Sequence, residues 1–394
     1  MMGRLGASRP TVLAFVRYYL PGYKSGGPIR TIANMVAVLG DEIDFRIVTS
    51  DRDATDTRPY AHLAGQEGWQ DVGKAKVLYL PPSQKNLRNM SRIIHQTAHD
   101  TLYLNSFFDP VFTLKPLLAR RLGLAPASRC VIAPRGEFSP GALKLKAAKK
   151  RSFLAISRVS GLYRNLIWQA SSGHEANDIR RVMGAIVADV RAAGDLPDPT
   201  APSSMLADHI DNGTLRIVFL SRISPMKNLG FTLEILRQVK VPVTFDIYGP
   251  IRDEDYWTNC CSLLDLLPAH VKATYHGPVE HARVASILAG YDLFLLPTLG
   301  ENFGHIILEA LAVGTPVLIA DTTPWRDLAE TGVGWDLPLT DAKAFADKIE
   351  LLARLSGREQ SEMRQRALTF AESRRNDAAT VEANRSLFNE YSYT

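Results

Sequence analysis

Short apolar runs, each followed by a loop and a helical stretch, occur in two sets along this chain, and this repetition constrains the fold more than any other feature. The first set covers residues 12–16, 45–49, 76–80, 101–104 and 130–133, with a helix expected near residues 28–39. The second set covers residues 215–220, 243–249, 271–275, 291–297 and 316–320, with a helix expected over residues 229–239. Short apolar strands separated by crossover helices are typical of parallel sheets. The sequence therefore predicts two doubly wound α/β units.

The boundary between the two units is expected in residues 194–204, which contain three prolines and several small polar residues. We expect an N-terminal Rossmann-like domain over residues 1–205, joined by a C-terminal helix over about 372–394, and a C-terminal domain over residues 206–371. The residues from 341 onward are expected to be helical. Open sheets bind ligands at the carboxyl ends of their strands, so a cleft between two facing domains is the expected site.

Charge is divided unevenly between the two halves. Residues 1–200 contain 28 Lys or Arg and 16 Asp or Glu, a balance of +12, whereas the remainder contains 18 and 25, a balance of −7. The N-terminal domain should therefore favour an anionic partner or surface. Nucleic acid is not expected as that partner, because aromatic stacking platforms and known binding modules are absent from the sequence.

The sequence favours a cytoplasmic protein. No apolar run reaches the roughly 18 residues of a spanning helix, and Arg17 interrupts the only apolar stretch near the N-terminus. Three cysteines, Cys130, Cys260 and Cys261, suggest neither a disulfide framework nor a metal cluster. The two Asp-x-Asp segments, residues 51–53 and 253–255, follow strand ends without a further ligand nearby, so we interpret them as solvated loops rather than metal sites.

Two glutamates, Glu301 and Glu309, are separated by seven residues in the most informative motif of the chain. The first lies in a Gly-containing loop, and the second lies on a short apolar helix that should stop at Gly314 and Pro316. A helix N-terminus attracts an anion, and ionised carboxylates accept hydrogen bonds from hydroxyl groups. This combination suits a ligand that carries both phosphate and sugar hydroxyls, although two solvated glutamates on an ordinary loop and helix are the alternative.

Cations and glycines form two further motifs. Arg222 and Lys227 follow the strand at residues 215–220 and precede a helix, an arrangement suited to a diphosphate. Gly26 and Gly27 follow the first strand, where they permit close backbone approach to a ligand, and a plain turn is the alternative. Phosphate ligands and hydroxyl ligands at the strand ends of one sheet point to a nucleotide sugar.

Taken together, these motifs resemble the glycosyltransferases of family 4, which are retaining enzymes with the two-domain GT-B fold. The resemblance spans most of the chain and rests on the glycine pair at 26–27, residues 134–136, residues 221–228 and the Glu-x7-Glu element at 301–309. It implies two Rossmann-like domains that face a central cleft. It also implies transfer of a hexose-type sugar from a UDP-, GDP- or ADP-sugar without any metal or other cofactor.

The resemblance also implies individual roles. Glu309 would hold the ribose of the donor, and Glu301 would lie beside the transferred sugar. Arg222 and Lys227 would hold the diphosphate and neutralise it as it leaves. The remaining donor contacts would come from one loop, from the backbone near the base and from the glycine pair: Asn302, Phe303, Gly304, His305, Val279, Gly26 and Gly27.

The sequence departs from this family at two positions. Many relatives carry a histidine where Asn105 stands, which puts the contacts to the far side of the sugar in doubt. Several have an apolar residue where Glu137 stands, and two interpretations of this carboxylate stay open: it reads the acceptor, or it is solvated.

A basic segment, residues 144–164, holds seven cations and no acid, with apolar residues between them. Peripheral contact with the anionic inner face of a membrane and an ordinary charged outer helix are equally consistent with this pattern. We therefore expect a cytoplasmic glycosyltransferase that acts on a glycan or lipid-linked glycan in surface polysaccharide synthesis. The alternatives are a nucleotide-sugar epimerase or phosphorylase, and a non-catalytic subunit that binds nucleotide sugars.

Overall fold

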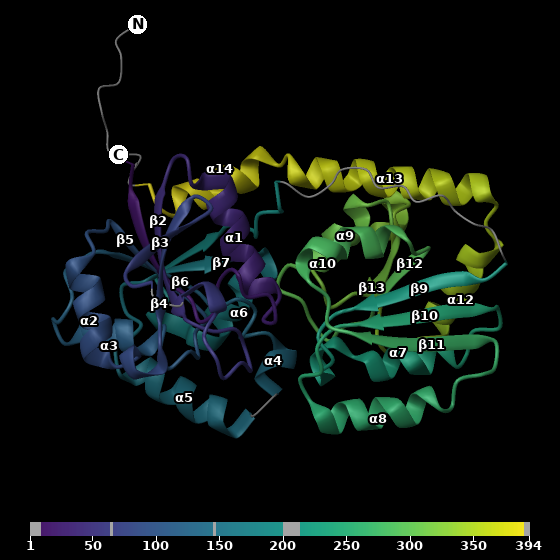
Figure 1. Ribbon diagram of the computed structural model, residues 1–394, viewed down its shortest axis with the longest axis horizontal. Coiled ribbons are helices and arrows are strands. Elements are labelled where there is room, and N and C mark those ends of the chain that lie inside the picture. Colours follow the sequence, from purple (N-terminus) through teal and green to yellow (C-terminus); the bar gives the residue numbers. More distant parts are fainter. Residues whose placement is uncertain (1–8, 64–65, 145–146, 200–212, 390–394) are drawn as a thin grey trace, which may run out of the picture. The chain divides into compact units, whose positions relative to one another are not determined.

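The computed structural model describes residues 9–63, 66–144, 147–199 and 213–389, and the chain forms two compact units. One unit comprises Met1–Pro199 with Ala378–Thr394, and the other comprises Thr200–Asp377. Each is an α/β unit built on a largely parallel sheet (Figure 1), which confirms the predicted fold class. Among the described helices, none combines the length and the apolar character that crossing a bilayer requires. The expected boundary at residues 205–206 lies outside the described residues.

Eight strands form the sheet of the N-terminal unit, in the order β3-β4-β2-β1-β5-β6-β7-β8. All neighbours are parallel except β3 and β4. The strands are β1 (Thr11–Phe15), β2 (Asp44–Ser50), β3 (Trp69–Val72), β4 (Ala75–Leu80), β5 (Thr101–Asn105), β6 (Arg129–Ala133), β7 (Ile167–Ala170) and β8 (Asp189–Ala192). The helices of this unit are α1 (Gly27–Leu39), α2 (Leu87–Gln96), α3 (Leu114–Arg121), α4 (Pro140–Lys144), α5 (Ala147–Val159), α6 (Gly173–Met183) and α14 (Ala378–Ser386).

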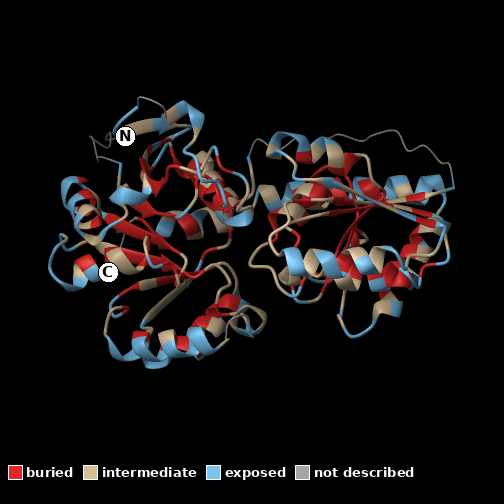
Figure 2. Ribbon diagram, turned by 60° about the horizontal axis from the view of Figure 1, so that its bottom comes forward, coloured by how far each residue is buried: buried red, intermediate tan, exposed pale blue. Residues whose placement is uncertain are grey.

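The central strand β1 is buried on both faces, and this explains its continuous apolar run. Successive side chains of a strand point to opposite faces. Val12 and Ala14 accordingly lie in the core beneath α1, and Leu13 and Phe15 lie in the core on the α2 and α3 side. The strands of both units form the buried interior in Figure 2.

Helix α14 returns the chain to the N-terminal unit. Arg385 of this helix forms an ion pair with Glu42 at 2.6 Å, and its neighbour Asn384 donates to the backbone oxygen of Gly194 at 2.7 Å. The ring of Phe388, just beyond the helix, packs edge-on against Phe45 of β2. These contacts attach the last described residues of the chain to its first sheet.

Six parallel strands form the sheet of the C-terminal unit, in the order β11-β10-β9-β12-β13-β14. They are β9 (Leu215–Leu220), β10 (Val243–Tyr248), β11 (Val271–Gly277), β12 (Leu293–Leu296), β13 (Val317–Ala320) and β14 (Gly334–Leu337). The helices are α7 (Leu229–Leu236), α8 (Glu254–Leu264), α9 (His281–Ala289), α10 (His305–Ala312), α11 (Leu328–Thr331), α12 (Ala342–Arg354) and α13 (Gly357–Arg375). Figure 1 shows α7 and α8 on one face of the sheet and α9 and α10 on the other.

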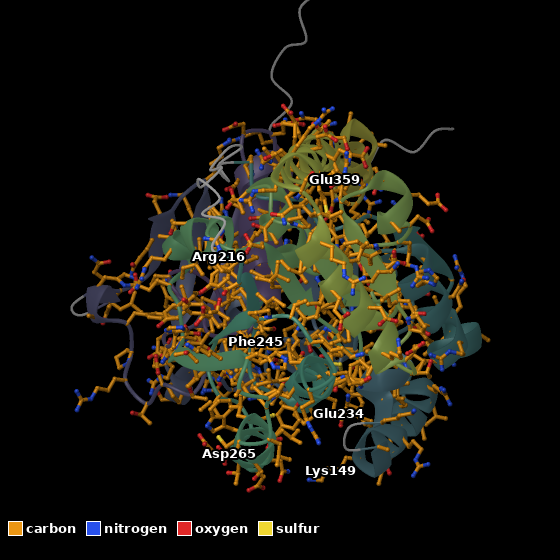
Figure 3. The ribbon with its side chains drawn as sticks, turned by 90° about the vertical axis from the view of Figure 1, so that its right-hand side faces the viewer. Lys149, Arg216, Glu234, Phe245, Asp265 and Glu359 are labelled. Atoms are coloured by element: carbon orange, nitrogen blue, oxygen red, sulfur yellow. The ribbon has the colours of Figure 1, made fainter. Side chains whose placement is uncertain are left out.

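The second sheet has a buried apolar core and an ion pair near the start of β9. Phe245 of β10 is fully buried in the core, whereas Arg216, near the start of β9, reaches Asp292 in an ion pair of 2.8 Å (both Phe245 and Arg216 are labelled in Figure 3). Helix α7 ends at Leu236, three residues before the expected end at residue 239. The predicted helical character beyond residue 341 is confirmed by α12, α13 and α14.

Two polar segments are more buried than the sequence suggests, although the boundary between the two units, at Pro199–Thr200, does fall within the expected linker. The first residues of the expected linker are packed into the N-terminal unit, because Asp195 is only 4% exposed and forms an ion pair with Arg135 at 2.7 Å. The Asp-x-Asp segment at 51–53 is not a solvated loop either. Asp53 is 3% exposed and accepts hydrogen bonds from the backbone N–H groups of Tyr23 and Lys24 at 2.8 and 3.0 Å. These carboxylates hold backbone segments together.

Candidate functional site

The two most informative motifs meet at one point of the C-terminal sheet. The chain adds β10 and β11 on one side of β9, then crosses over and adds β12, β13 and β14 on the other side. The strand order therefore reverses between β9 and β12, and ligands of open α/β sheets bind at the carboxyl ends of strands at such a reversal. The loop with Arg222 and Lys227 follows β9, and the loop with Glu301 follows β12.

Backbone and hydroxyl contacts tie these two loops together. The backbone N–H of Leu299 and the hydroxyl of Thr298 both donate to the backbone oxygen of Met226, each at 2.9 Å. The Asn228 amide donates to the backbone oxygen of Pro297 at 2.9 Å. Asn228 has a positive φ of 59°, so the chain turns sharply between the short helix at Pro225–Lys227 and α7. This turn directs Lys227 toward the β12 loop.

Lys227 and Glu301 form an ion pair whose side chains are each 10% exposed. A buried charge is stable only when it is paired or hydrogen-bonded, and each of these two side chains is the partner of the other. The structure thus brings together two residues that stand 74 positions apart in the sequence. The pair presents an ammonium group and a carboxylate at the same strand edge.

Arg222 adds a second cation beside this pair. Burial lowers the pKa of its guanidinium, the attraction of Glu301 raises it and the repulsion of Arg252 lowers it further. Among the described residues, no side-chain hydrogen bond or ion pair neutralises Arg222. A partly buried cation with another cation nearby is stabilised by an anion, and its position beside Lys227 suits a diphosphate.

The β10 loop brings Arg252 to the site, and the sequence interpretation missed it. Ile223 pairs with Ile251 in an isolated parallel bridge, and the Arg252 N–H donates to the backbone oxygen of Ile223 at 3.0 Å. Gly249 makes this close approach possible, because a Cβ at this position would lie 1.8 Å from the Ser221 oxygen. The pair Gly249-Pro250, at the end of the strand predicted for residues 243–249, is the sequence signal that marks this loop.

Helix α10 begins directly after Glu301 and its loop. Gly304 is the N-cap with φ 82° and ψ 55°, and a Cβ there would lie 2.8 Å from the Ile307 side chain. The Phe303 ring packs against the rings of His305 and Trp325, which holds the start of the helix in place. The first N–H groups of a helix have no partner within the helix, and they attract anions.

The other residues that were predicted to contact the nucleotide-sugar donor lie elsewhere in the structure. Glu309 lies partly exposed on α10, and Asn302 lies partly exposed in the loop before it. Val279 lies between β11 and α9 and packs partly against the core of the C-terminal unit. Gly26 and Gly27 belong to the N-terminal unit, where Gly26 is the N-cap of α1 with φ 66° and a Cβ on either glycine would meet nothing within 4 Å.

Glu137 is not solvated, so that sequence interpretation is wrong, and the interpretation that it reads the acceptor stays a prediction. Its carboxylate accepts hydrogen bonds from the Ser106 hydroxyl at 2.6 Å and from the backbone N–H groups of Phe107 and Phe108. Burial raises the pKa of this carboxyl, and the hydrogen bonds oppose that shift. Asn105, at the end of β5, is buried and accepts from Arg135. Both side chains therefore brace the carboxyl edge of the first sheet.

Comparison with known proteins identifies the class of this fold. Residues 207–370 match the model of the family "Glycosyl transferases group 1". A phosphatidyl-myo-inositol mannosyltransferase of Mycobacterium leprae is 30% identical over 144 residues, which are 35% of this chain and 37% of the relative. A D-inositol 3-phosphate glycosyltransferase of the same species is 28% identical over 156 residues, 38% of this chain and 36% of the relative. The matches thus span little more than a third of these relatives.

Solved structures match almost the whole chain. Anabaena HepE, solved in complex with UDP and glucose, aligns with a TM-score of 0.70 at 16% identity, covering 96% of this chain and 98% of HepE. A trehalose-phosphate synthase from Burkholderia xenovorans aligns with a TM-score of 0.68 at 9% identity, covering 97% and 100%. The chain has the GT-B fold. This confirms the predicted fold class of two Rossmann-like domains.

Proposed function

We propose that this chain is a retaining glycosyltransferase of the family 4 type. It transfers a hexose-type sugar from a nucleotide diphosphate to a hydroxyl of a glycan or lipid-linked glycan in surface polysaccharide synthesis. The observation that carries the proposal is the arrangement of Lys227, Glu301 and Arg222 at the point where the strand order of the second sheet reverses. The group 1 family match over residues 207–370 and the UDP complex of HepE support a nucleotide-sugar donor.

The buried ion pair suggests how the donor enters. In the free chain, Glu301 neutralises Lys227. A diphosphate competes for the ammonium group of Lys227, and Glu301 is then released to accept hydrogen bonds from sugar hydroxyls. Donor binding would thus exchange one ion pair for two sets of contacts, one to phosphate and one to sugar. Glu309, eight positions further along on α10, is assigned to the ribose hydroxyls.

Charge neutralisation then supplies the chemistry. The bond between the anomeric carbon and the diphosphate breaks while the acceptor hydroxyl attacks from the same face, and the leaving diphosphate takes the hydroxyl proton. Arg222 and Lys227 stabilise the negative charge that grows on the diphosphate, as fixed groups in a protein site do for a developing anion. We assign this role to the two cations without a metal ion or another cofactor.

Donor turnover tests this proposal. The intact chain is assayed for hydrolysis and transfer with UDP-, GDP- and ADP-hexoses, beside Lys227→Ala. A matched control is Lys343→Ala, because Lys343 lies on the surface of α12 with a side chain 73% exposed. Loss of one group that stabilises a developing anion lowers turnover by about 10²–10³, so we expect that loss for Lys227→Ala alone. A chain that binds and turns over none of the donors refutes the enzyme assignment, and NMR of the product's anomeric configuration tests retention.

Helix α5 supports a further part of the proposal, contact with an anionic membrane. Ile156 and Val159 are 64% and 81% exposed on this helix, and Lys149 (labelled in Figure 3) and Arg151 are exposed on it as well. Exposed apolar side chains flanked by cations suit the surface of an anionic bilayer. We expect sedimentation with phosphatidylglycerol vesicles that weakens when Ile156 and Val159 are replaced by serine. A protein that stays in the supernatant with those vesicles excludes this contact.

A further inference from the structure

Two loops lie next to each other at the carboxyl edge of the second sheet. Strands β12 and β13 are neighbours in this sheet and run parallel (Figure 1). The loop after β12 covers residues 297–304 and carries Glu301, and the loop after β13 covers residues 321–327. Loops after the carboxyl ends of adjacent parallel strands share one edge of a sheet. None of the sequence motifs includes residues 321–327.

Two side chains of the loop after β13 bind backbone carbonyls of the loop after β12. The Thr322 hydroxyl donates to the backbone oxygen of Thr298 at 2.7 Å. The indole N–H of Trp325 donates to the backbone oxygen of Phe303. These two carbonyls lie on either side of Glu301 in the sequence. The segment that carries Glu301 is therefore held at both of its ends by side chains from a single short loop.

The hydrogen bond from Trp325 also fixes the direction of the peptide that precedes α10. In a planar trans peptide, the C=O and the N–H that follows it point in opposite directions. Because the Phe303 oxygen points toward the indole, the N–H of Gly304 points away from it. Gly304 is the N-cap of α10, and the first N–H groups of a helix attract anions. Trp325 thus sets the orientation of the helix start that we assign to the donor.

The loop after β13 is itself fixed to the sheet. The backbone N–H of Asp321 donates to the backbone oxygen of Leu337, at the end of β14, at 2.9 Å. Arg326 forms an ion pair with Asp336 of β14 at 3.2 Å. The Trp325 side chain packs in the core of the C-terminal unit and is only 6% exposed. This loop is therefore a rigid support for the loop that carries the predicted donor contacts.

We propose that Thr322 and Trp325 are positioning residues for the donor site. Through the backbone of residues 298–303, they hold Glu301 and the start of α10 in the arrangement that binds a nucleoside diphosphate. Neither side chain is assigned a contact with the ligand. A loop that is fixed before the ligand arrives loses less conformational freedom on binding, so the ligand binds more tightly. The role in donor binding rests on the proposed function, whereas the two hydrogen bonds to the loop do not.

Variants that remove one hydrogen-bond donor at nearly constant shape test this role. Thr322→Val removes the hydroxyl and Thr322→Ser keeps it, and because Thr322 is exposed, both should fold even if Trp325→Phe does not. Trp325→Phe keeps an aromatic ring and removes the indole N–H.

Thr331→Val and Trp335→Phe are the matched controls. The Thr331 hydroxyl also donates to a backbone oxygen, within α11 at 3.1 Å, and Trp335 is a similarly buried indole in β14, 9% exposed. Two quantities are measured on the full chain: hydrogen exchange of residues 298–304, and calorimetric affinity for UDP, GDP and ADP.

We expect Thr322→Val and Trp325→Phe each to speed the exchange of residues 298–304 and to weaken diphosphate binding by about two- to tenfold, the effect of one lost hydrogen bond. Thr322→Ser and the two controls should bind as the unaltered chain does.

Unchanged exchange overturns the proposal. Faster exchange with unchanged affinity also overturns it, because the two residues would then be structural only. An equal loss of affinity in Trp335→Phe and Trp325→Phe does the same, since it would reflect a general loss of packing. An unaltered chain that binds none of the three diphosphates refutes the proposed function, and the donor role of this loop with it. Failure of the inference alone appears only in the variants.

Discussion

Gly249 joins the loops after β9 and β10, and its replacement by alanine is the sharpest test of how the cation site is built. Gly249 has φ +139°, and an added Cβ would lie 1.8 Å from the Ser221 oxygen and 2.6 Å from the Ser221 carbonyl carbon. The obstacle is backbone, so a side-chain rotation cannot relieve it. The two loops must separate, and this breaks the hydrogen bonds from Ile223 N–H to Pro250 and from Arg252 N–H to Ile223.

The expected cost follows from these contacts. A non-glycine residue at positive φ costs about 1–2 kcal/mol, and each lost backbone hydrogen bond costs about 0.5–1.5 kcal/mol. Gly249→Ala should therefore destabilise the C-terminal unit by about 2–5 kcal/mol, which corresponds to a drop in Tm of roughly 5–20 °C for a unit of this size.

Calorimetry of the full chain measures this drop in Tm. Faster hydrogen exchange of residues 221–223 in Gly249→Ala would show that the loss of stability lies in these loops. Gly230→Ala is the matched control. Gly230 is helical in α7, and a Cβ there would lie 3.6 Å from its nearest neighbour, an ordinary contact. Alanine is favoured over glycine in a helix by up to about 1 kcal/mol, so the control should keep or raise the Tm. A Gly249→Ala chain with an unchanged Tm and unchanged exchange would falsify the reasoning.

Three further predictions concern buried carboxylates. Glu301→Gln leaves Lys227 without its ion-pair partner, so calorimetry should show nucleoside diphosphate binding tightened by roughly tenfold. Sugar transfer should slow at the same time. Weaker binding contradicts the proposal that Lys227 exchanges Glu301 for the diphosphate. Asp53→Asn replaces one of the two carboxylate oxygens that accept from the backbone of Tyr23, Lys24 and Ala54 with an NH2 group and removes the negative charge. Hydrogen exchange of residues 22–27 should therefore accelerate with little change elsewhere, and unchanged exchange contradicts the bracing role. Burial raises the pKa of the Glu137 carboxyl, so its stabilising contribution is present below the ordinary value of 4.5 and is lost as pH rises through the raised pKa. Thermal melts at increasing pH above 4.5 should therefore show wild type losing stability relative to Glu137→Gln, and parallel curves contradict the shift.

The apolar runs of the sequence predicted the central strands because most of those strands are buried on both faces, although β10 alternates between buried and half-exposed residues. Strands β1, β2, β5, β9, β10 and β13 lie within one or two residues of the predicted runs. The sequence interpretation missed β3, β8 and β14, which lie at the edges of the two sheets, and the short inner strand β7. Edge strands such as β3 and β8 are largely half-exposed and carry polar residues, so they lack a continuous apolar run.

Burial of single charged residues could not be predicted, because it depends on donors from distant parts of the chain. Glu137 is satisfied by a hydroxyl and N–H groups that lie about 30 positions earlier, and Asp53 by N–H groups about 30 positions earlier. The local sequence around a carboxylate is the same whether or not hydrogen-bond donors from distant parts of the chain lie beside it in the fold. The ion pair of Lys227 and Glu301 has the same cause, although the motif around each residue was visible separately.

Both units place buried carboxylates at the carboxyl edges of their sheets, but these carboxylates do different things. In the N-terminal unit, Asp109 and Asp51 pair with Arg17 and Arg52, and Asp53 holds the backbone of residues 23 and 24. In the C-terminal unit, Glu301 pairs with Lys227, and Arg222 has no ion-pair partner among the described residues. Pairing and hydrogen bonding stabilise buried charges in the free protein. A guanidinium that is partly buried without such a partner is stabilised by an anion, and this is why our proposal assigns Arg222 to the donor diphosphate.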